Sequence, residues 1–272
     1  MDLKQKANQI RQQVLEMIYK AGTGHIGGDL SETDILVALY YKYLNCSPEL
    51  VDNPERDRFV LSKGHCVEAL YCILADRGFI PQEDLATYSQ FGSKYIGHPN
   101  NKINGIEMNS GSLGHGLALG VGMALAGRMD KRSYKTYVVM GDGELAEGSV
   151  WEAAMAAAHY KLANLIAIVD RNGLQISGTT EQVMAHGDLA GRFKAFGWHV
   201  LELADGNNME EICGALESAQ AYTEGPTMII AHTTKGKGCP SIENNVAWHH
   251  KIPTEEQMAT MRKELKAGEM HG

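Results

Sequence analysis

The chain has 272 residues, of which 44% are hydrophobic, and carries a formal net charge of -8. This is enough apolar material for one large globular domain or two small ones. The acidic balance argues against nucleic acid as a partner, because nucleic-acid-binding proteins generally present a basic face. No apolar run approaches the roughly 20 residues that a membrane-spanning helix requires, so the sequence predicts no membrane partner.

The N-terminal segment and the cysteines indicate a cytoplasmic protein. Charged residues interrupt the first predicted helix, so it does not resemble a signal peptide. Its apolar face is formed by Ile10, Val14, Met17, Ile18 and Ala21. The five cysteines are odd in number and contain no CxxC pair, so neither a disulfide framework nor a zinc site is indicated.

Short buried strands alternate with helices along the rest of the chain. The strands are expected at residues 59–61, 137–140, 165–169, 198–203 and 227–231. This alternation predicts an α/β fold of three layers, in which a mainly parallel sheet has helices on both faces. No linker or internal repeat is visible, so residues 1–272 are expected to form a single domain.

The segments between the strands give further expectations. Residues 21–30 are too glycine-rich for regular structure, and Ser31 is expected to cap the helix that follows them. Another helix is expected from Pro81 to about Gln90. A charged helix at residues 254–266 is expected to be solvated or to pack on a partner.

The segment 111–127 contains small residues at nearly every helical turn. A glycine costs about 1 kcal/mol at each helical position. The helix expected here therefore gains stability from the close approach of another element, either within the domain or from another chain.

Unusual turns follow four of the predicted strands. They are SKGH at 62–65, GDG at 141–143, DRNG at 170–173 and TTKGKG at 233–238. Ligands of parallel sheets bind at the carboxyl ends of the strands. The sequence therefore predicts that these turns border one ligand site.

The sequence from Gly141 to Ala146 also matches the relaxed GxGxxA fingerprint of dinucleotide-binding proteins. Asp142 would then face a pyrophosphate, and like charges about 4 Å apart cost roughly 4 kcal/mol at an effective dielectric near 20. Asp170 lies beyond the usual spacing of about 20 residues for the ribose-binding acid. Glu144 and Glu147 add more negative charge.

A divalent cation between Asp142 and a diphosphate turns this repulsion into attraction. Mg²⁺ prefers one or two protein oxygens together with phosphate oxygens. Asn172 and the Leu174 carbonyl follow the neighbouring strand and supply further oxygens. The two turns are therefore expected to lie side by side and to hold a metal-bound diphosphate.

The sequence contains 11 histidines. His25, His65, His98 and His249 lie in glycine, proline or polar turns, where side chains can converge on a ligand. Imidazoles both hold phosphate oxygens and move protons near neutral pH. Five others have no special setting and are expected to be structural or exposed: His159, His186, His199, His232 and His271.

Together, these turns and the segments GTGHIGG, SKGHCVEALY, FGSKYIGHP, SGSLGHG and WHH resemble the thiamine diphosphate-binding half of transketolases over almost the whole chain. GDG marks thiamine diphosphate enzymes in general, whereas SKGH and FGSKYIGHP point to transketolase within them. The resemblance implies the thiamine diphosphate-binding (PP-domain) fold. It also implies thiamine diphosphate and Mg²⁺ as cofactors, with Ca²⁺ or Mn²⁺ able to substitute for Mg²⁺.

The resemblance implies roles for individual residues. The expected metal ligands are Asp142, Asn172 and the Leu174 carbonyl. The expected cofactor-binding residues are His65, Gly111, Leu113, Gly141, Asp142, Gly143, Glu147, Glu152, Asn172 and His249. Of these, Glu147 and Glu152 match acids that link two active sites across a subunit interface. The expected catalytic residues are His25, His65, His98 and His249.

The sequence departs from the family pattern at several positions. Ile26 stands where proline is common, and Ser112 and His115 replace the proline and glutamine of GPLGQG. His250 replaces the glycine of WHG, which leaves two candidates for one family histidine. The register after Trp248 selects His249.

The chain contains no counterpart of the pyrimidine-binding domain of full-length transketolases. The resemblance therefore implies the N-terminal subunit of a split transketolase, inactive alone, whose partner in an α2β2 complex is a separately encoded C-terminal subunit. The expected reaction moves a two-carbon ketol unit between sugar phosphates. The alternatives are a deoxyxylulose-phosphate synthase-like enzyme, a transketolase for an unusual sugar phosphate, an NAD-binding protein and a non-catalytic interaction subunit.

Overall fold

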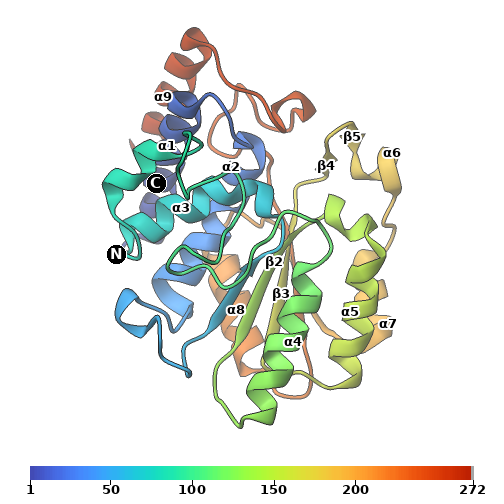
Figure 1. Cartoon of the computed structure of the whole chain (residues 1–272). Coiled ribbons are helices and arrows are strands. Elements are labelled where there is room, and N and C mark those ends of the chain that lie inside the picture. The colour runs from blue at the N-terminus through green and yellow to red at the C-terminus, as the bar shows by residue number, and fades with distance from the viewer. Residues whose placement is uncertain (271–272) are drawn as a thin grey trace.

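The structure, a computed structural model, describes residues 1–270 (Figure 1). A five-stranded sheet runs in the order β1-β2-β3-β7-β6, and each neighbouring pair is parallel. Its strands are β1 (Arg58–Leu61), β2 (Thr136–Gly141), β3 (Leu165–Arg171), β6 (His199–Leu203) and β7 (Thr227–His232). The predicted parallel sheet is confirmed, and each strand boundary lies within two residues of its expected place.

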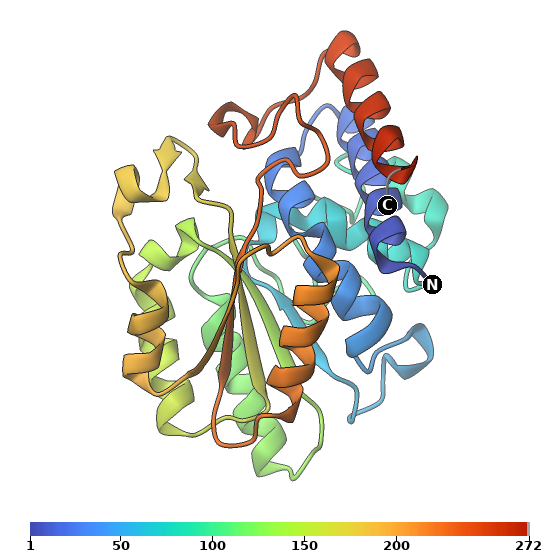
Figure 2. The same ribbon diagram turned by 180° about the vertical axis from the view of Figure 1, so that it is seen from behind.

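Helices cover both faces of the sheet, as the two views show (Figures 1 and 2). On one face lie α4 (Gly116–Met129), α5 (Gly148–His159) and α7 (Leu189–Phe196). On the other lie α1 (Leu3–Ala21), α2 (Ile26–Ala38), α3 (Val67–Asp76) and α8 (Met209–Ala221). The predicted three-layer α/β arrangement is confirmed.

Each face of the sheet has its own apolar core. Along β2, Val138 and Met140 join the core beneath α4 and α5, whereas Tyr137 and Val139 join the core beneath α2 and α8. This alternation follows from the two-residue period of a strand. Because the sheet is covered on both sides, its three central strands, β2, β3 and β7, are almost wholly buried, and the turns at their ends are open to a ligand.

The C-terminal helix α9 (Glu255–Met270) lies along α1, as Figure 2 shows. Met258, Met261 and Leu265 are buried in the core of the domain. The expectation that this helix is solvated or packed on a partner is wrong for this apolar face, which α1 of the same chain covers. Most of its charged residues up to Lys266 are exposed.

The glycine-rich segment 21–30 is not wholly irregular. Helix α2 begins at Ile26, and His25 occupies its N-cap position, so Ser31 is an interior helical residue rather than the cap. All residues of α2 are buried. Tertiary packing stabilises the helix despite its glycines, because close packing at Gly27 and Gly28 leaves no room for a side chain there.

Two other helices differ from expectation. The segment after Pro81 forms a 3-10 helix, η4 (Gln82–Thr87), rather than an α-helix that reaches Gln90. The small-residue helix α4 begins only at Gly116, because Gly111 and Gly114 adopt positive φ angles in a preceding loop. No helix within residues 1–270 is long and apolar enough to cross a membrane.

Candidate functional site

The carboxyl ends of β1, β2, β3 and β7 border a cavity of about 280 Å³. The turns that follow these strands line it, together with the start of α2 and the loop before α4. The lining residues are His25, Gly28, Lys63, His65, Gly111, Leu113, Gly141, Asp142, Gly143, Glu144, Asn172, Leu174, Gln175, Ile176, Lys235 and His249. Most of the residues predicted for the site therefore meet in one place.

Asp142 lies at the centre of this arrangement and is 1% exposed. Its Oδ1 accepts a hydrogen bond from the Gly143 N–H at 2.9 Å, and its Oδ2 accepts one from the Gly173 N–H at 2.6 Å. The Asp142 N–H in turn donates to the Asp170 carbonyl at 3.3 Å. These bonds confirm that the turns after β2 and β3 lie side by side.

Asn172 and Leu174 follow β3 and line the same cavity as Asp142. The Asn172 Oδ1 accepts a hydrogen bond from the Leu174 N–H at 3.1 Å, which orients the amide. Leu174 begins a two-residue antiparallel pairing of β4 (Leu174–Gln175) with β5 (Gly178–Thr179). The chain therefore brings one carboxylate, one amide oxygen and one backbone carbonyl to a common edge.

The donor set around Asp142 fits a hard divalent cation. Burial, followed by the charge of Asp170, raises the pKa of Asp142 to about 6, so a cation bound there would relieve an unfavourable buried charge. Within residues 1–270, no three His, Cys, Asp or Glu side chains gather in a way that could hold a metal by themselves. Mg²⁺ needs no such group, because it is usually held by few protein oxygens together with phosphate oxygens.

Glycine at position 143 lets the turn after β2 pack closely against Gln175 of the β4–β5 hairpin. A Cβ atom there would lie 2.6 Å from the Gln175 Cγ, which is far too close for two carbon atoms. The Gln175 Nε2 donates to the Gly143 carbonyl at 3.1 Å and so holds this turn against the β4–β5 hairpin.

A buried network of ion pairs and hydrogen bonds, centred on Lys63 and Asp170, connects the segments that line the cavity. The Lys63 ammonium pairs with Asp170 and with Glu32, the latter at 3.2 Å, and donates to the Gly28 carbonyl at 3.1 Å. Ser31 Oγ donates to Asp170 at 2.6 Å, and Thr233 also donates to this carboxylate. Asp170 therefore ties together the segments after β1, β3 and β7 and the first turns of α2.

Lys235 is the second buried cation of the cavity. It lies in the TTKGKG turn after β7, is 2% exposed, and its Nζ lies 2.9 Å from the His249 Nδ1. Burial lowers the pKa of its ammonium group. An anionic ligand in the cavity would stabilise the charged form. Sequence patterns alone do not single out Lys63 or Lys235, although both lie in turns that were predicted to border the site.

Four imidazoles cluster at the other side of the cavity. The ring centroid of His25 lies 5.0 Å from that of His65, 5.5 Å from that of His249 and 4.6 Å from that of His250. His249 lines the cavity, whereas His250 is exposed and lies outside the lining. The geometry therefore favours His249, as the register after Trp248 predicted.

Burial is the largest cause of the pKa shifts in this cluster. It acts with the charges of neighbouring imidazoles and of Lys63 and Lys235 to lower the pKa of His25 to about 4, of His249 to about 3 and of His65 to about 2. All three rings are therefore neutral near pH 7. Each can donate one hydrogen bond and accept another.

His98 stands at the edge of the cavity rather than in its lining. Its ring packs on Gly111, where φ is 140° and where an added Cβ would lie 2.6 Å from the His98 Cδ2. Gly111 and Leu113 themselves line the cavity. The loop before α4 is thus shaped around the His98 side chain.

The acids of the turn after β2 have different surroundings. Glu144 is buried and accepts hydrogen bonds from the Ser62 hydroxyl, from the Gly114 N–H at 2.8 Å and from the Gly141 N–H at 3.2 Å. The sequence pattern indicated only extra negative charge at Glu144. It did not predict that this carboxylate accepts hydrogen bonds from three surrounding turns. Glu147 and Glu152 are exposed and do not line the cavity.

The histidines expected to be structural or exposed mostly lie away from the site. His159 is exposed, His199 stacks on Tyr222, and the His232 Nε2 lies 2.8 Å from the Glu202 Oε1. His186 is an exception, because its ring is 2% exposed and lies near the backbone of Asp142. His271 lies outside the described residues.

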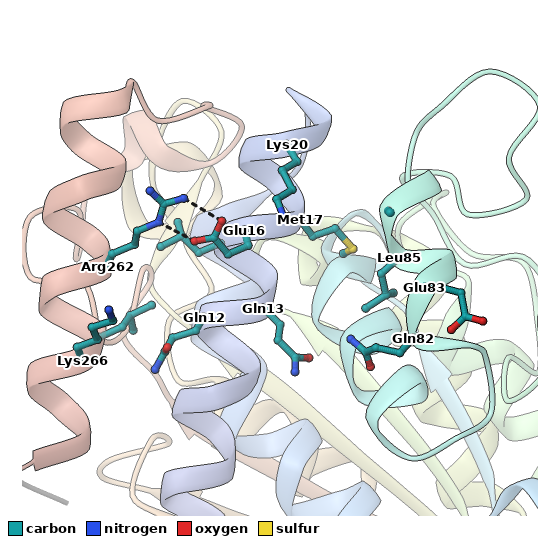
Figure 3. Close-up of a pocket in the computed structure, with 13 residues that line it drawn as sticks. Gln12, Gln13, Glu16, Met17, Lys20, Gln82, Glu83, Leu85, Arg262 and Lys266 are labelled. Carbon is teal, nitrogen blue, oxygen red and sulfur yellow. Dashed lines mark hydrogen bonds and ion pairs between the residues drawn. The ribbon is translucent and has the colours of Figure 1, made fainter.

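A second hollow, of about 510 Å³, lies between α1, η4 and α9 (Figure 3). Glu16 and Arg262 pair across one wall of it, with Arg262 Nε 2.6 Å from Glu16 Oε1. Long polar side chains such as Gln12 and Lys266 make up much of the rest. It lies away from the strand ends and contains none of the predicted site residues.

Comparison with known proteins agrees with this geometry. Residues 3–269 match the family model described as "Transketolase, thiamine diphosphate binding domain". The chain is 52% identical to one of the subunits of apulose-4-phosphate transketolase from Phocaeicola vulgatus, over 94% of this chain and 90% of that protein. It is 43% identical to 6-deoxy-6-sulfo-D-fructose transketolase subunit SqwG from a Clostridium species, over 97% of this chain and 96% of that protein.

The fold agrees equally well with a solved structure. The crystal structure of transketolase from Campylobacter jejuni superposes with a TM-score of 0.92 at 34% identity. It covers 99% of this chain, and this chain covers 45% of it. The predicted thiamine diphosphate-binding fold is thus confirmed, and the chain belongs to the transketolase family as a thiamine diphosphate-binding domain.

Proposed function

We propose that this chain is the N-terminal subunit of a split transketolase and acts as a single cofactor-binding domain. It binds the diphosphate end of thiamine diphosphate through a Mg²⁺ ion held by Asp142, Asn172 and the Leu174 carbonyl. The observation that carries this proposal is the buried Asp142 carboxylate, which backbone N–H groups orient between the turns after β2 and β3. Ca²⁺ or Mn²⁺ would fit the same oxygen ligands.

The surrounding residues suit the remaining parts of the cofactor and the substrate. Lys235, His65 and His249 line the cavity beside the metal turn and would donate hydrogen bonds to diphosphate oxygens. Gly111 and Leu113 line the wall next to His98 and would lie against the cofactor rings. The bound cofactor supplies the carbanion chemistry, and the protein supplies orientation and electrostatics.

The neutral histidines would serve the sugar. His25 and His98 border the open part of the site, and a neutral imidazole can either donate a hydrogen bond to a substrate oxygen or accept a proton from a hydroxyl group. Their lowered pKa values keep both rings neutral near pH 7, so each can act as a base and as a hydrogen-bond donor. We assign His25, His65, His98 and His249 as the catalytic histidines.

The cavity needs a cover, which we assign to a C-terminal transketolase subunit. Ile176 lines the cavity and is nevertheless 73% exposed, so a large apolar side chain at the rim lacks a packing partner in this chain. The two relatives named as subunits match this chain over nearly their full length. We propose a cytoplasmic α2β2 complex, in which the exposed Glu147 and Glu152 lie at the subunit interface.

The donor would be a ketose phosphate or a close analogue. The names of the two relatives, which include apulose-4-phosphate and 6-deoxy-6-sulfo-D-fructose, favour an unusual sugar with a terminal anion over the common pentose phosphates. A deoxyxylulose-phosphate synthase-like activity is the second candidate. It would use pyruvate as the donor, so an assay with pyruvate against ketose phosphates separates the two.

The test is to produce the chain together with a separately encoded C-terminal transketolase subunit and to measure ketol transfer. We expect transfer that requires both subunits, thiamine diphosphate and Mg²⁺. Binding of NAD without a response to thiamine diphosphate would instead support a dinucleotide-binding protein. A stable complex with no transfer to any tested acceptor would indicate a non-catalytic interaction subunit.

A further inference from the structure

One buried carboxylate joins three of the segments that surround the cavity. Glu144, in the short 3-10 helix η5 (Gly143–Ala146), is 2% exposed, and its two oxygens accept three hydrogen bonds. Oε1 accepts from the Ser62 hydroxyl and from the Gly114 N–H at 2.8 Å, and Oε2 accepts from the Gly141 N–H at 3.2 Å. The Glu144 carboxylate acts in all three bonds as the acceptor.

The loop before α4, residues 110–116, is also bonded to the turn after β1 at both of its ends. At one end, Ser110 Oγ donates to the Leu61 carbonyl at 2.7 Å. At the other end, the Gly116 N–H donates to the Ser62 Oγ at 3.1 Å, and this hydroxyl is the one that donates to Glu144. The loop is therefore held from below by the end of β1 and from the side by one carboxylate.

The middle of this loop forms one wall of the cavity. Gly111 and Leu113 line the cavity and are the residues proposed to lie against the cofactor rings, so we call them the ring wall. The residue after Leu113 is Gly114, whose N–H donates to Glu144. Glu144 also accepts from Gly141, in the turn after β2 that would hold the metal. One carboxylate thus joins the ring wall to the metal turn.

From these contacts we propose that Glu144 is a positioning residue, which fixes the ring wall relative to the metal turn before the cofactor binds. The role in cofactor binding rests on the proposed function, whereas the bridge between the two segments does not. A ligand binds more tightly to a loop that is already ordered, because ordering the loop on binding costs free energy. Loss of the bridge should therefore weaken the binding of thiamine diphosphate.

The metal turn has hydrogen bonds of its own that do not involve Glu144. The Asp142 carboxylate accepts from the Gly143 N–H at 2.9 Å and from the Gly173 N–H at 2.6 Å. Inorganic pyrophosphate with Mg²⁺ would use this turn but not the ring wall. Its binding should therefore depend less on Glu144 than the binding of thiamine diphosphate does. This difference separates a positioning role from a general loss of the site.

Glu144→Gln tests the bridge with little change in shape. The amide has one acceptor oxygen, and its nitrogen can only donate. The side chain can therefore accept from Ser62 and Gly114 or from Gly141, but not from both sides. In either orientation at least one backbone N–H loses its acceptor, and the bridge between the ring wall and the metal turn is broken.

Asp57→Asn provides a matched control at the opposite edge of the sheet. Asp57 directly precedes β1 and is 8% exposed. Its two oxygens accept hydrogen bonds from the Lys135 N–H at 2.7 Å and from the Asn45 N–H at 2.9 Å. Asp57→Asn therefore removes the same kind of contact, between a buried carboxylate and a backbone N–H, at a place that does not line the cavity.

The experiment measures amide hydrogen exchange of the chain by NMR and titrates it calorimetrically with thiamine diphosphate and, separately, with pyrophosphate, both with Mg²⁺. For Glu144→Gln we expect exchange of the Gly114 or the Gly141 amide to rise about tenfold or more, because a hydrogen bond to a charged group is lost. Thiamine diphosphate affinity should fall about tenfold, while pyrophosphate affinity stays within about twofold. Asp57→Asn should speed exchange near Asp57 and leave both affinities unchanged.

Ser62→Ala provides a second variant in case Glu144→Gln does not fold. It removes the hydroxyl that links Glu144 to the Gly116 N–H, so exchange at Gly116 should rise and thiamine diphosphate affinity should again fall more than pyrophosphate affinity. Equal losses of affinity for the two ligands, or a thiamine diphosphate affinity that neither variant changes, would overturn the proposal. If the wild type binds neither ligand and exchange still rises in the variants, the proposed function is overturned and the bridge is supported.

Discussion

The Asp142 Oδ2 accepts a hydrogen bond from the backbone N–H of Gly173 at 2.6 Å, which joins the turn after β2 to the turn after β3. Gly173 has a φ of 77°, a conformation that glycine adopts without strain. The bond aims one oxygen of a buried carboxylate at the edge where Asn172 and Leu174 meet the cavity. The proposed metal site depends on this contact.

His249 and His250 should differ sharply when each is replaced. His249 lines the cavity beside Lys235, so His249→Ala should lower ketol transfer by about 100-fold or more, the range of a lost proton-transfer group. His250 is exposed and only packs on His25, so His250→Gly should cost no more than an ordinary surface substitution. Steady-state kinetics of the two complexes would measure this. A larger loss for His250→Gly would reverse the assignment.

Two glycines of α4 should respond in opposite ways to alanine. A Cβ at Gly120 would overlap the Val138 side chain on β2, so Gly120→Ala should destabilise the protein by about 1–3 kcal/mol. A Cβ at Gly122 meets nothing within 4 Å, so Gly122→Ala should stabilise it by up to about 1 kcal/mol through helix propensity. Urea unfolding of the isolated chain gives both free energies.

Gly120 and Gly122 also bear on the prediction that the small-residue helix α4 gains stability from the close approach of another element. The close approach predicted from its glycines is made by the sheet of the same domain at Gly120. The face that contains Gly122 is open and stays a candidate for packing near a partner. Gly122→Ala should then stabilise the chain and yet weaken its assembly with the C-terminal subunit. Unimpaired assembly would place the subunit contact elsewhere.

Glu32 should make the stability of the isolated chain depend on pH. Burial raises its pKa from 4.5 to about 8, although Lys63 opposes the shift and Asp170 and Glu68 add to it. Between these two values the folded state holds a proton that the unfolded chain has lost, so the free energy of unfolding falls as pH rises through this window.

Glu32→Gln removes this contribution. Urea unfolding from about pH 5 to about pH 9 should show a flatter pH dependence for Glu32→Gln than for the wild type, with the variant gaining relative stability at the alkaline end. The exposed Glu224 provides a control, because Glu224→Gln should follow the wild-type curve. Parallel curves for Glu32→Gln and the wild type would show that Glu32 is already ionised at low pH.

The strand ends and their turns could be predicted because local chemistry marks them. Glycine, aspartate and asparagine after a short apolar run indicate a turn at the carboxyl end of a buried strand, and parallel strands bring such turns to one edge. This reasoning correctly placed Asp142, Asn172 and His65 around one cavity. Alternation of strands and helices was enough to predict the layers of the fold.

The ionic network could not be predicted, because its partners are distant in sequence. Lys63 meets Asp170 only after β1 and β3 are placed in one sheet, and no local pattern records that pairing. Helix α2 was missed in part for the same reason. Its glycines disfavour a helix locally, but packing at Gly27 and Gly28 requires them.

The most direct test of the central claim is calorimetric titration of this chain with thiamine diphosphate, once with Mg²⁺ and once with EDTA. The wild type should bind at least about tenfold more tightly with Mg²⁺, and Asp142→Asn should lose this difference while keeping its fold by circular dichroism. Asp188→Asn, at the exposed N-cap of α7, should behave like the wild type. Wild-type binding that ignores Mg²⁺, or a Mg²⁺ response that survives in Asp142→Asn, would contradict the account.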